Sequence, residues 1–204
     1  ISAKKRGHIR ERYFLNQLAK TDLAQHRLDQ IKAHNIAHLR DQRLQKNKSD
    51  TVLYELTIIN HIFNICIKDW SYPISNPVKK IYKPKSGCLR KRRLTSFEYN
   101  YLVNNNKVNS KLKAIIELAI ETGMRRGEIL KIEQHHLKNK TLEIPLTKNG
   151  TSREIPLTSK AINILHDSSL PFAMTPNALR LAWSRLKKKG KIKDLHFHDL
   201  RHEA

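Results

Sequence analysis

A pair of arginines at a break between two helical patterns is the first stretch that could act on a phosphate group. In ETGMRRGEIL, a glycine interrupts the helical period, Arg125 and Arg126 follow, and Glu128 lies in the first turn of a new helix. An arginine at such a break can point into a cleft, while the free N–H groups of the new helix add positive potential. Taken alone, two neighbouring arginines are more often surface residues, so the stretch gains meaning only from partners elsewhere.

Two further stretches supply a lysine and a cluster of histidines. Lys148 directly precedes an Asn-Gly turn, from which a lysine could swing toward a ligand and withdraw. The last residues, LHFHDLRHEA, contain His196, His198, Arg201 and His202, and a helix would place His198 and Arg201 on one face. Histidines four positions apart also fit a zinc site, but no carboxylate or cysteine pattern completes one, so we expect no metal.

Two arginines, a lysine and a histidine are suited to phosphoryl transfer. Planar guanidinium groups bind the non-bridging oxygens of a phosphate in pairs. A lysine can protonate a leaving oxygen, and a histidine can act as an acid or a base near neutral pH. Such a set of cations requires no cofactor.

The overall charge indicates a polyanionic partner. The 204 residues include 40 Lys and Arg against 18 Asp and Glu, a formal net charge of +22, and both halves of the chain are basic. This imbalance favours nucleic acid. We find no signal peptide, lipidation motif or apolar run long enough for a membrane span, so we expect no membrane partner. Cys66 and Cys88 form no disulfide framework, which suggests a reducing, cytoplasmic setting.

The first half of the chain predicts helices. In TVLYELTIINHIFNICIKDW, an apolar residue recurs every three or four positions, as on the buried face of a helix. Ser49 and Asp50 are the expected caps of that helix. Residues 71–87 contain three prolines and a glycine, so no helix crosses them. The apolar positions of the pattern are Val52, Leu56, Ile59, Phe63 and Cys66.

A basic run, RKRR, follows this break and is expected to contact DNA. It comprises Arg90, Lys91, Arg92 and Arg93. A single charge run is usually only a solvated surface, and the prediction depends on the positive charge of both halves of the chain.

The second half predicts helices and one hairpin. Thr95 and Glu98 form a capping box before a helix. The Asn-Gly dipeptide between two β-prone runs predicts a hairpin over residues 141–157. Thr175 is the expected cap of a helix that begins with Pro176 and stops at Gly190.

These elements predict a mainly α protein of two domains that closes as a clamp around a DNA duplex. Residues 1–85 would form a helical DNA-binding domain, and residues 86–93 a basic linker. Residues 94–204 would form a mostly helical domain with a small antiparallel sheet. Helices of both domains are expected to enter major grooves.

Three motifs in order carry a resemblance to a known family. TGMRRGEIL, TKNGTSREIPLT and FHDLRHEA resemble the catalytic domain of the tyrosine recombinases, the phage integrase family, and the helical first half is similar to that family's core-binding domain. NALRLAWSRL before the last motif is similar to prophage integrases and plasmid shufflon recombinases. The residues that match the family's functional positions are Arg125 and Glu128 of the T-G-x-R-x-x-E box, Lys148 of the hairpin, and His198 and Arg201 of the H-x-x-R box, with His202 directly after it.

The resemblance implies a site-specific recombinase that cuts and rejoins DNA through a 3′-phosphotyrosyl link. Arg125 and Arg201 would hold the scissile phosphate, Lys148 would protonate the leaving 5′ oxygen, and His198 would assist proton transfer. Glu128 and His202 would support them. Such enzymes work as homotetramers on paired DNA sites, here in the cytoplasm at the nucleoid of a bacterial or phage source.

The nucleophile is where the sequence departs from the family. The family's tyrosine follows the H-x-x-R box, but all six tyrosines of this chain precede the first box. We therefore expect the chain as given to be a truncated, inactive monomer whose full-length form is the enzyme.

Two other functions remain open. A recombinase relic could act only as a sequence-selective DNA-binding protein, without strand cleavage. An RNA-binding protein is a weaker alternative, because aromatic residues for base stacking are few, at 6% of the chain.

Overall fold

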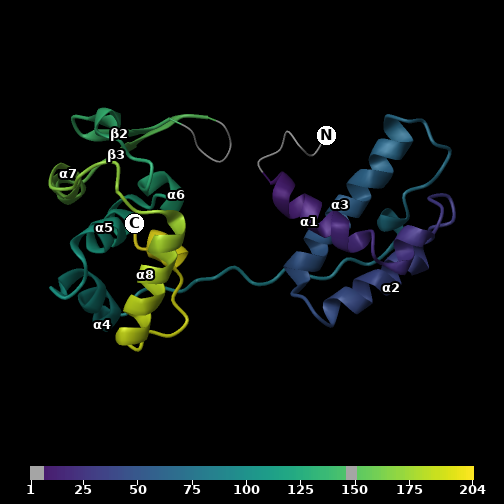
Figure 1. Cartoon of the computed structure of the whole chain (residues 1–204), viewed down its shortest axis with the longest axis horizontal. Helices are drawn as coiled ribbons and strands as arrows, with labels where there is room; N and C mark the ends of the chain where they lie inside the picture. The colour runs from purple at the N-terminus through teal and green to yellow at the C-terminus, as the bar shows by residue number, and fades with distance from the viewer. Residues whose placement is uncertain (1–6, 146–150) are drawn as a thin grey trace. The chain divides into compact units, whose positions relative to one another are not determined.

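The computed structural model describes residues 7–145 and 151–204, and the chain divides into two compact units, residues 1–89 and 90–204 (Figure 1). Each unit has its own hydrophobic core. The described residues are mainly helical, with a three-stranded antiparallel sheet in the second unit. The predicted fold class is thus confirmed. No helix within these ranges combines the length and the apolarity needed to cross a membrane.

The first unit is built from helices. Helix α3 is the longest of them, and α2 and a 3-10 helix pack against it. The helices are α1 (His8–Leu18), η2 (Asp22–Gln25), α2 (Ala33–Leu44), α3 (Ser49–Lys68) and η3 (Pro77–Lys80).

The buried face of α3 follows the predicted period. Leu56, Ile59 and Phe63 are almost fully buried, together with the other two positions of the pattern. Burial of a side chain of this size stabilises a fold by roughly 1.5–3 kcal/mol. The caps expected at Ser49 and Asp50 are wrong, because both residues lie inside the first turn of α3. Asp50 instead accepts hydrogen bonds from the Ser86 hydroxyl and the Gly87 amide, so it fastens the later chain to the helix.

The second unit surrounds helix α5, which packs against α6, α7, α8 and the last 3-10 helix (Figure 1). Its helices are α4 (Ser96–Tyr99), the π-helix η4 (Asn100–Asn104), α5 (Ser110–Thr122), α6 (Arg126–Ile129), η5 (Gln134–His136), α7 (Ser159–His166), α8 (Pro176–Lys189) and η6 (Phe197–His202). Its strands are β1 (Leu137–Lys138), β2 (Thr141–Ile144) and β3 (Arg153–Pro156).

Side-chain caps start four of the described helices of this unit, one of them α7, whose cap is Thr158. The capping box of Thr95 and Glu98 is present before α4, as predicted. Thr175, the residue before Pro176, accepts a hydrogen bond from the Ala178 amide and caps α8. Asn109 caps α5, the helix that carries the centre of the core. Each cap accepts N–H groups that the helix cannot satisfy by itself.

The sheet contains the predicted hairpin. Strands β2 and β3 pair antiparallel, with Thr141 opposite Pro156 and Ile144 opposite Arg153. Leu142 and Ile144 alternate toward the core, so this register is fixed by burial of one face. The turn with Lys148 lies outside the described residues.

Helix α8 ends at Lys189, and Gly190 follows it as the C-cap, as predicted. Gly190 has φ of −81°, a conformation open to any residue, and the positive φ of 52° belongs to Lys191. A Cβ atom at Gly190 would lie 2.5 Å from the ring of Tyr101. Close approach to an aromatic ring therefore favours glycine at this position.

Candidate active site

Arg125 stands at a tight turn between α5 and α6. Gly123 ends α5 with φ of 58°, a left-handed conformation that costs other residues energy. Arg125 is the residue before the first turn of α6, and its amide donates to Glu128 Oε2 over 2.9 Å. The sequence thus turns the chain sharply and fixes Arg125 beside the new helix.

Glu128 connects two arginines. Nη1 of Arg125 donates to Oε1 over 2.9 Å, and Nη2 of Arg153 donates to Oε2 over 3.0 Å. Burial by itself would raise the pKa of Glu128, but the amide and guanidinium of Arg125 and the charge of Arg153 lower it below its ordinary value. Glu128 is therefore ionised at neutral pH, and its predicted supporting role stays a prediction.

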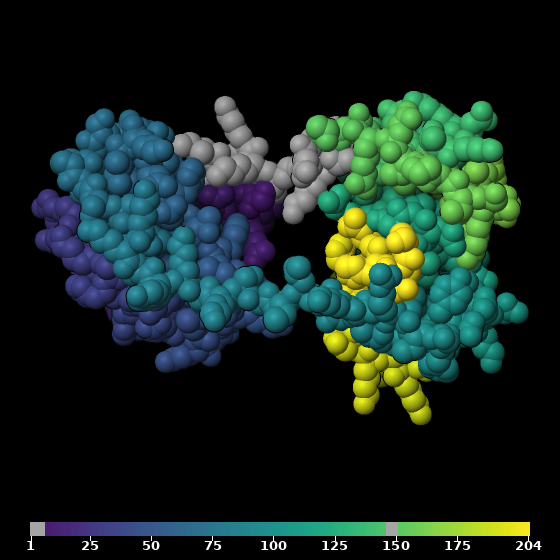
Figure 2. Space-filling view, turned by 180° about the vertical axis from the view of Figure 1, so that it is seen from behind, coloured from purple at the N-terminus to yellow at the C-terminus, as the bar shows by residue number. Residues whose placement is uncertain are grey.

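Arg201 reaches the same turn from the end of the chain. Its Nε donates to the carbonyl oxygen of Gly123 over 2.5 Å, although the two residues are 78 positions apart. The C-terminal end of α5 carries partial negative charge and carbonyls without helical partners, so a guanidinium is favoured there. This contact places η6 next to the Arg125 turn. Figure 2 shows the last residues of the chain (yellow) at the surface of the second unit.

An open pocket of about 450 Å³ brings together three of the predicted catalytic residues. Arg125 and Arg201 are close enough for the charge of Arg125 to lower the pKa of Arg201, after burial, which is the larger cause. Arg201 remains charged at neutral pH despite this shift. The lining residues are Arg125, Arg126, Gly127, His196, Phe197, His198 and Arg201.

His198 is poised to be neutral. Although His198 is exposed, partial desolvation lowers its pKa, and the positive charges of Arg201, His202 and Arg125 lower the pKa further. The negative charge of Asp199 opposes this lowering less than Arg201 and His202 cause it. A neutral imidazole can accept a proton, so the site can hold an anion and a base side by side.

His202 lies beside His198, with ring centroids 6.4 Å apart. Among residues 7–145 and 151–204, no three His, Cys, Asp or Glu side chains are grouped to hold a metal ion. Lys148, the fourth predicted catalytic residue, lies outside the described residues.

The basic run at the start of the second unit has carboxylate partners. Arg90 binds Asp199 with two hydrogen bonds, of 3.1 and 2.8 Å, and also binds Asp194. Arg92 pairs with Glu98, and Arg93 approaches Glu203 within 3.8 Å. Lys91 is exposed and has no ion-pair partner among the described residues. DNA contact by the four residues stays a prediction, and Lys91 is the one whose charge is free for it.

Arg153 and Asp199 are the functional neighbours that the sequence motifs missed. Asp199 lies between His198 and Arg201 in the sequence, and its side chain is almost fully buried. It accepts a hydrogen bond of 2.8 Å from the His196 amide. Arg153 lies on β3, in a pattern that predicts only a strand. The sequence offered one signal for Arg153: this charged residue shares the half-buried face of β3 with Ile155.

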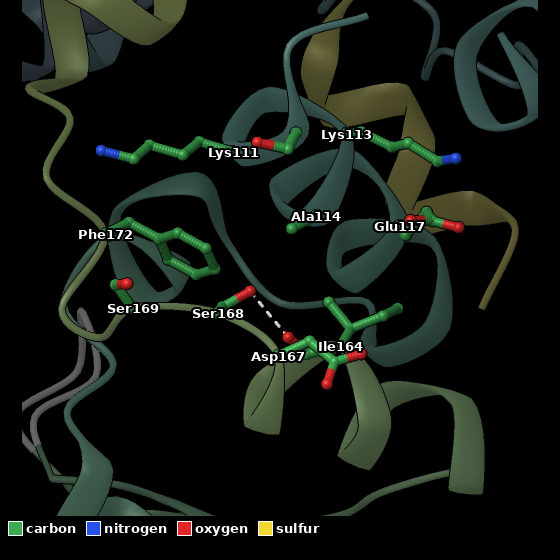
Figure 3. A pocket seen from close by; sticks show the side chains of 10 residues that line it. Lys111, Lys113, Ala114, Glu117, Ile164, Asp167, Ser168, Ser169 and Phe172 are labelled. Atoms are coloured by element: carbon green, nitrogen blue, oxygen red, sulfur yellow. Dashed lines mark hydrogen bonds between the residues drawn. The ribbon is translucent and has the colours of Figure 1, made fainter. Parts of the chain in front are cut away.

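A second pocket in the same unit lacks the chemistry of the first. This pocket has a volume of about 320 Å³. Ser168 is one of its lining residues, and the hydroxyl of Ser168 donates a hydrogen bond to the Ile164 carbonyl (Figure 3). None of the predicted site residues lines it. Its lining combines an apolar floor with charges of both signs: Ser110, Lys111, Lys113, Ala114, Glu117, Ile164, Asp167, Ser168, Ser169 and Phe172.

Comparison with known proteins identifies the family. Residues 92–170 match the phage integrase family. A shufflon-specific DNA recombinase of Escherichia coli is 37% identical over 220 aligned positions, which cover 100% of this chain and 57% of that protein. A protein described as an integrase/recombinase of Haemophilus influenzae is 33% identical, with 100% of this chain and 72% of that protein covered.

The chain belongs to the phage integrase family of tyrosine recombinases, so the predicted resemblance is confirmed. The fold is also similar to that of a lambda integrase dimer bound to a COC′ core site, with a TM-score of 0.79 and 19% identity over 98% of this chain and 81% of that one. The chain spans 57% of the length of the shufflon recombinase.

Proposed function

We propose that the whole protein is a site-specific DNA recombinase that cuts and rejoins strands through a 3′-phosphotyrosyl intermediate. The observation that carries the proposal is the single pocket lined by Arg125, His198 and Arg201. Family membership and the names of the relatives support the same reaction class.

In the cleavage step, a tyrosine oxygen attacks the phosphorus, a bond from tyrosine to the 3′ phosphate forms, and the bond to the 5′ oxygen breaks. Arg125 and Arg201 bind the non-bridging oxygens, on which negative charge increases. Lys148 gives a proton to the 5′ oxygen, and neutral His198 assists proton transfer by accepting the proton of the tyrosine hydroxyl. Rejoining reverses these transfers with a different 5′ end.

The partner is double-stranded DNA, and both basic units contribute to binding it as a clamp. No tyrosine follows His198 and Arg201 in the residues given, so we infer that this chain alone binds DNA without cleaving it. The whole protein assembles as a homotetramer on paired sites, whereas the 204-residue chain is a monomer. Its place is the bacterial cytoplasm, at the nucleoid.

The test uses the whole reading frame and duplexes selected by the protein from a random pool. A phosphotyrosyl adduct, detected as a protein–DNA band on a denaturing gel, is the expected product. Arg125→Ala and Arg201→Ala each abolish it. Adduct formation at the wild-type rate in both variants would reject the assigned roles. Sequence-selective binding without any adduct from the whole protein would instead identify a binding-only relic.

A further inference from the structure

Glu128 serves two arginines that come from different parts of the second unit. Arg125 lies next to it in the turn before α6, and Arg153 reaches it from β3, 25 positions later in the chain. The carboxylate divides its oxygens between them, with Oε1 for the Arg125 guanidinium and Oε2 for Arg153. One negative charge is thus shared by two positive ones.

The number of charges around the pocket depends on Arg153. Arg201 donates to a neutral carbonyl and has no carboxylate partner among the described residues. Counted without Arg126, which also lines the pocket, the charges of Arg125, Arg153 and Arg201 exceed that of Glu128 by two. Without Arg153, Glu128 would cancel Arg125, and the excess would fall to one. A phosphodiester brings one negative charge, and attack by an oxyanion adds a second, so the larger excess suits the transition state.

Burial makes this balance effective. The Glu128 side chain is only 8% exposed, so its charge acts on Arg125 with little screening by water. Arg153 has its Nε buried without a hydrogen-bond partner among the described residues, while 38% of its side chain stays exposed. The positive charge of Arg153 also acts on Arg201. Its influence therefore extends to both arginines of the pocket.

We propose that Arg153 is a positioning residue that occupies Glu128 and so leaves the charge of Arg125 available to the scissile phosphate. This role rests on the proposed function. Arg153 itself need not touch the DNA. Because it lies opposite Ile144 at the end of the β2–β3 pairing, the same ion pair fastens the strand that follows Lys148 in the sequence to the Arg125 turn.

The test compares four versions of the whole reading frame: wild type, Arg153→Gln, Glu128→Gln and the double variant. Arg153→Gln is expected to slow adduct formation on saturating DNA by roughly tenfold to a hundredfold, with the dissociation constant for DNA changed by less than about threefold. In the double variant, Arg125 and Arg201 again leave two uncompensated positive charges. Its rate of adduct formation should recover at least about half of the loss, measured on a logarithmic scale. Recovery of the rate when Glu128 is also replaced distinguishes charge balance from a merely structural role of Arg153, because a second loss of a native contact would not repair a structural defect.

Lys138→Gln is the matched control. It removes one positive charge from the same sheet, but Lys138 pairs with Glu143 and Glu154 rather than Glu128. Its rate should stay within about twofold of wild type. Circular dichroism of each variant verifies that the fold persists. An unchanged rate for Arg153→Gln, or a double variant as slow as Arg153→Gln, would overturn the proposal.

Orthovanadate binding to the 204-residue chain separates this proposal from the proposed function. Vanadium NMR should show binding that is at least about fivefold weaker in Arg153→Gln and returns to within about twofold of wild type in the double variant. A wild-type reading frame without adduct, together with this vanadate pattern, rejects the recombinase but supports the role of Arg153. Equal vanadate affinity in wild type and Arg153→Gln, or none in wild type, rejects that role.

Discussion

Arg90 and Asp199 are 109 positions apart in the sequence, and their side chains form a two-point ion pair with distances of 3.1 and 2.8 Å. Asp199 at the same time accepts the amide of His196 and lies between His198 and Arg201 in sequence. The first residue of the second unit thus holds the segment that delivers two predicted catalytic side chains. Arg90 can in this way influence the pocket without lining it.

Asp199→Asn should lower the free energy of unfolding of the 204-residue chain by roughly 2 kcal/mol, because a buried carboxylate loses charge-assisted hydrogen bonds. Arg90→Gln should also lower the unfolding midpoint, whereas Lys91→Gln, the matched control, should leave it unchanged. Urea titration followed by circular dichroism measures all three. Equal midpoints for Arg90→Gln and Lys91→Gln would show that the ion pair does not hold the segment.

The contribution of Asp199 depends on pH in a defined direction. Burial tends to raise the pKa of Asp199, but Arg90 and the His196 amide lower it below its ordinary value. The stabilisation is therefore complete above the unfolded pKa and is lost as pH falls through the depressed folded pKa. The difference in stability between wild type and Asp199→Asn should shrink on acidification. A difference that stays constant from neutral pH into strong acid would contradict this linkage.

His198 should titrate below the ordinary histidine pKa of about 6.5. Partial desolvation is the main cause of the lowered pKa, and Arg201 is the next. Arg201→Gln should therefore raise the pKa of His198, measured from its ring protons by NMR. Arg180→Gln is the control, because Arg180 is exposed on α8 and hydrogen-bonded to Asn177. A greater effect of Arg180→Gln than of Arg201→Gln would contradict the described placement of Arg201.

Gly123→Ala should destabilise the chain by roughly 1–2 kcal/mol, because φ of 58° forces a Cβ into a left-handed conformation. The new Cβ would also lie 3.2 Å from that of Ala204. Gly127→Ala is the matched control in the neighbouring helix, where a Cβ meets nothing within 4 Å. This change should be neutral or stabilise by about 0.5–1 kcal/mol. Thermal unfolding compares the two, and equal effects would contradict the left-handed turn.

Lys91→Gln should weaken DNA binding by the 204-residue chain and reduce the slope of log affinity against log salt by about 1, if Lys91 binds one phosphate. Lys138→Gln, whose lysine is paired with Glu143 and Glu154, should leave the slope unchanged. Fluorescence anisotropy at several salt concentrations provides the slopes. Identical slopes for wild type and Lys91→Gln would remove Lys91 from the DNA contacts.

Local patterns explain which parts of the fold were predictable. The buried face of α3, the Thr95 and Thr175 caps and the β2–β3 hairpin each depend on residues close in sequence, and each was predicted. Asp50 shows the limit of such patterns. Its position suits a helix cap, but its partners, Ser86 and Gly87, are more than 30 positions away.

The candidate site also has a part that local patterns predict and a part that they do not. Arg125, Glu128, His198 and Arg201 are recognisable because their spacings within each motif reflect local turns. Their convergence depends on the contact from Arg201 to Gly123, which no periodicity reveals. The run at 90–93 reads as free surface charge because its carboxylate partners are distant, apart from Glu98. Ion pairs across long stretches of chain leave no pattern in the sequence.

Every contact described above that shapes the pocket joins residues after Leu89. The chemistry is therefore portable: exchanging residues 1–89 for the matching part of a relative would leave Arg90 and its partners intact. The contacts that shape the pocket therefore need no residue of the first unit, so the junction at Leu89 is a place where residues 1–89 can be exchanged without removing any of these contacts.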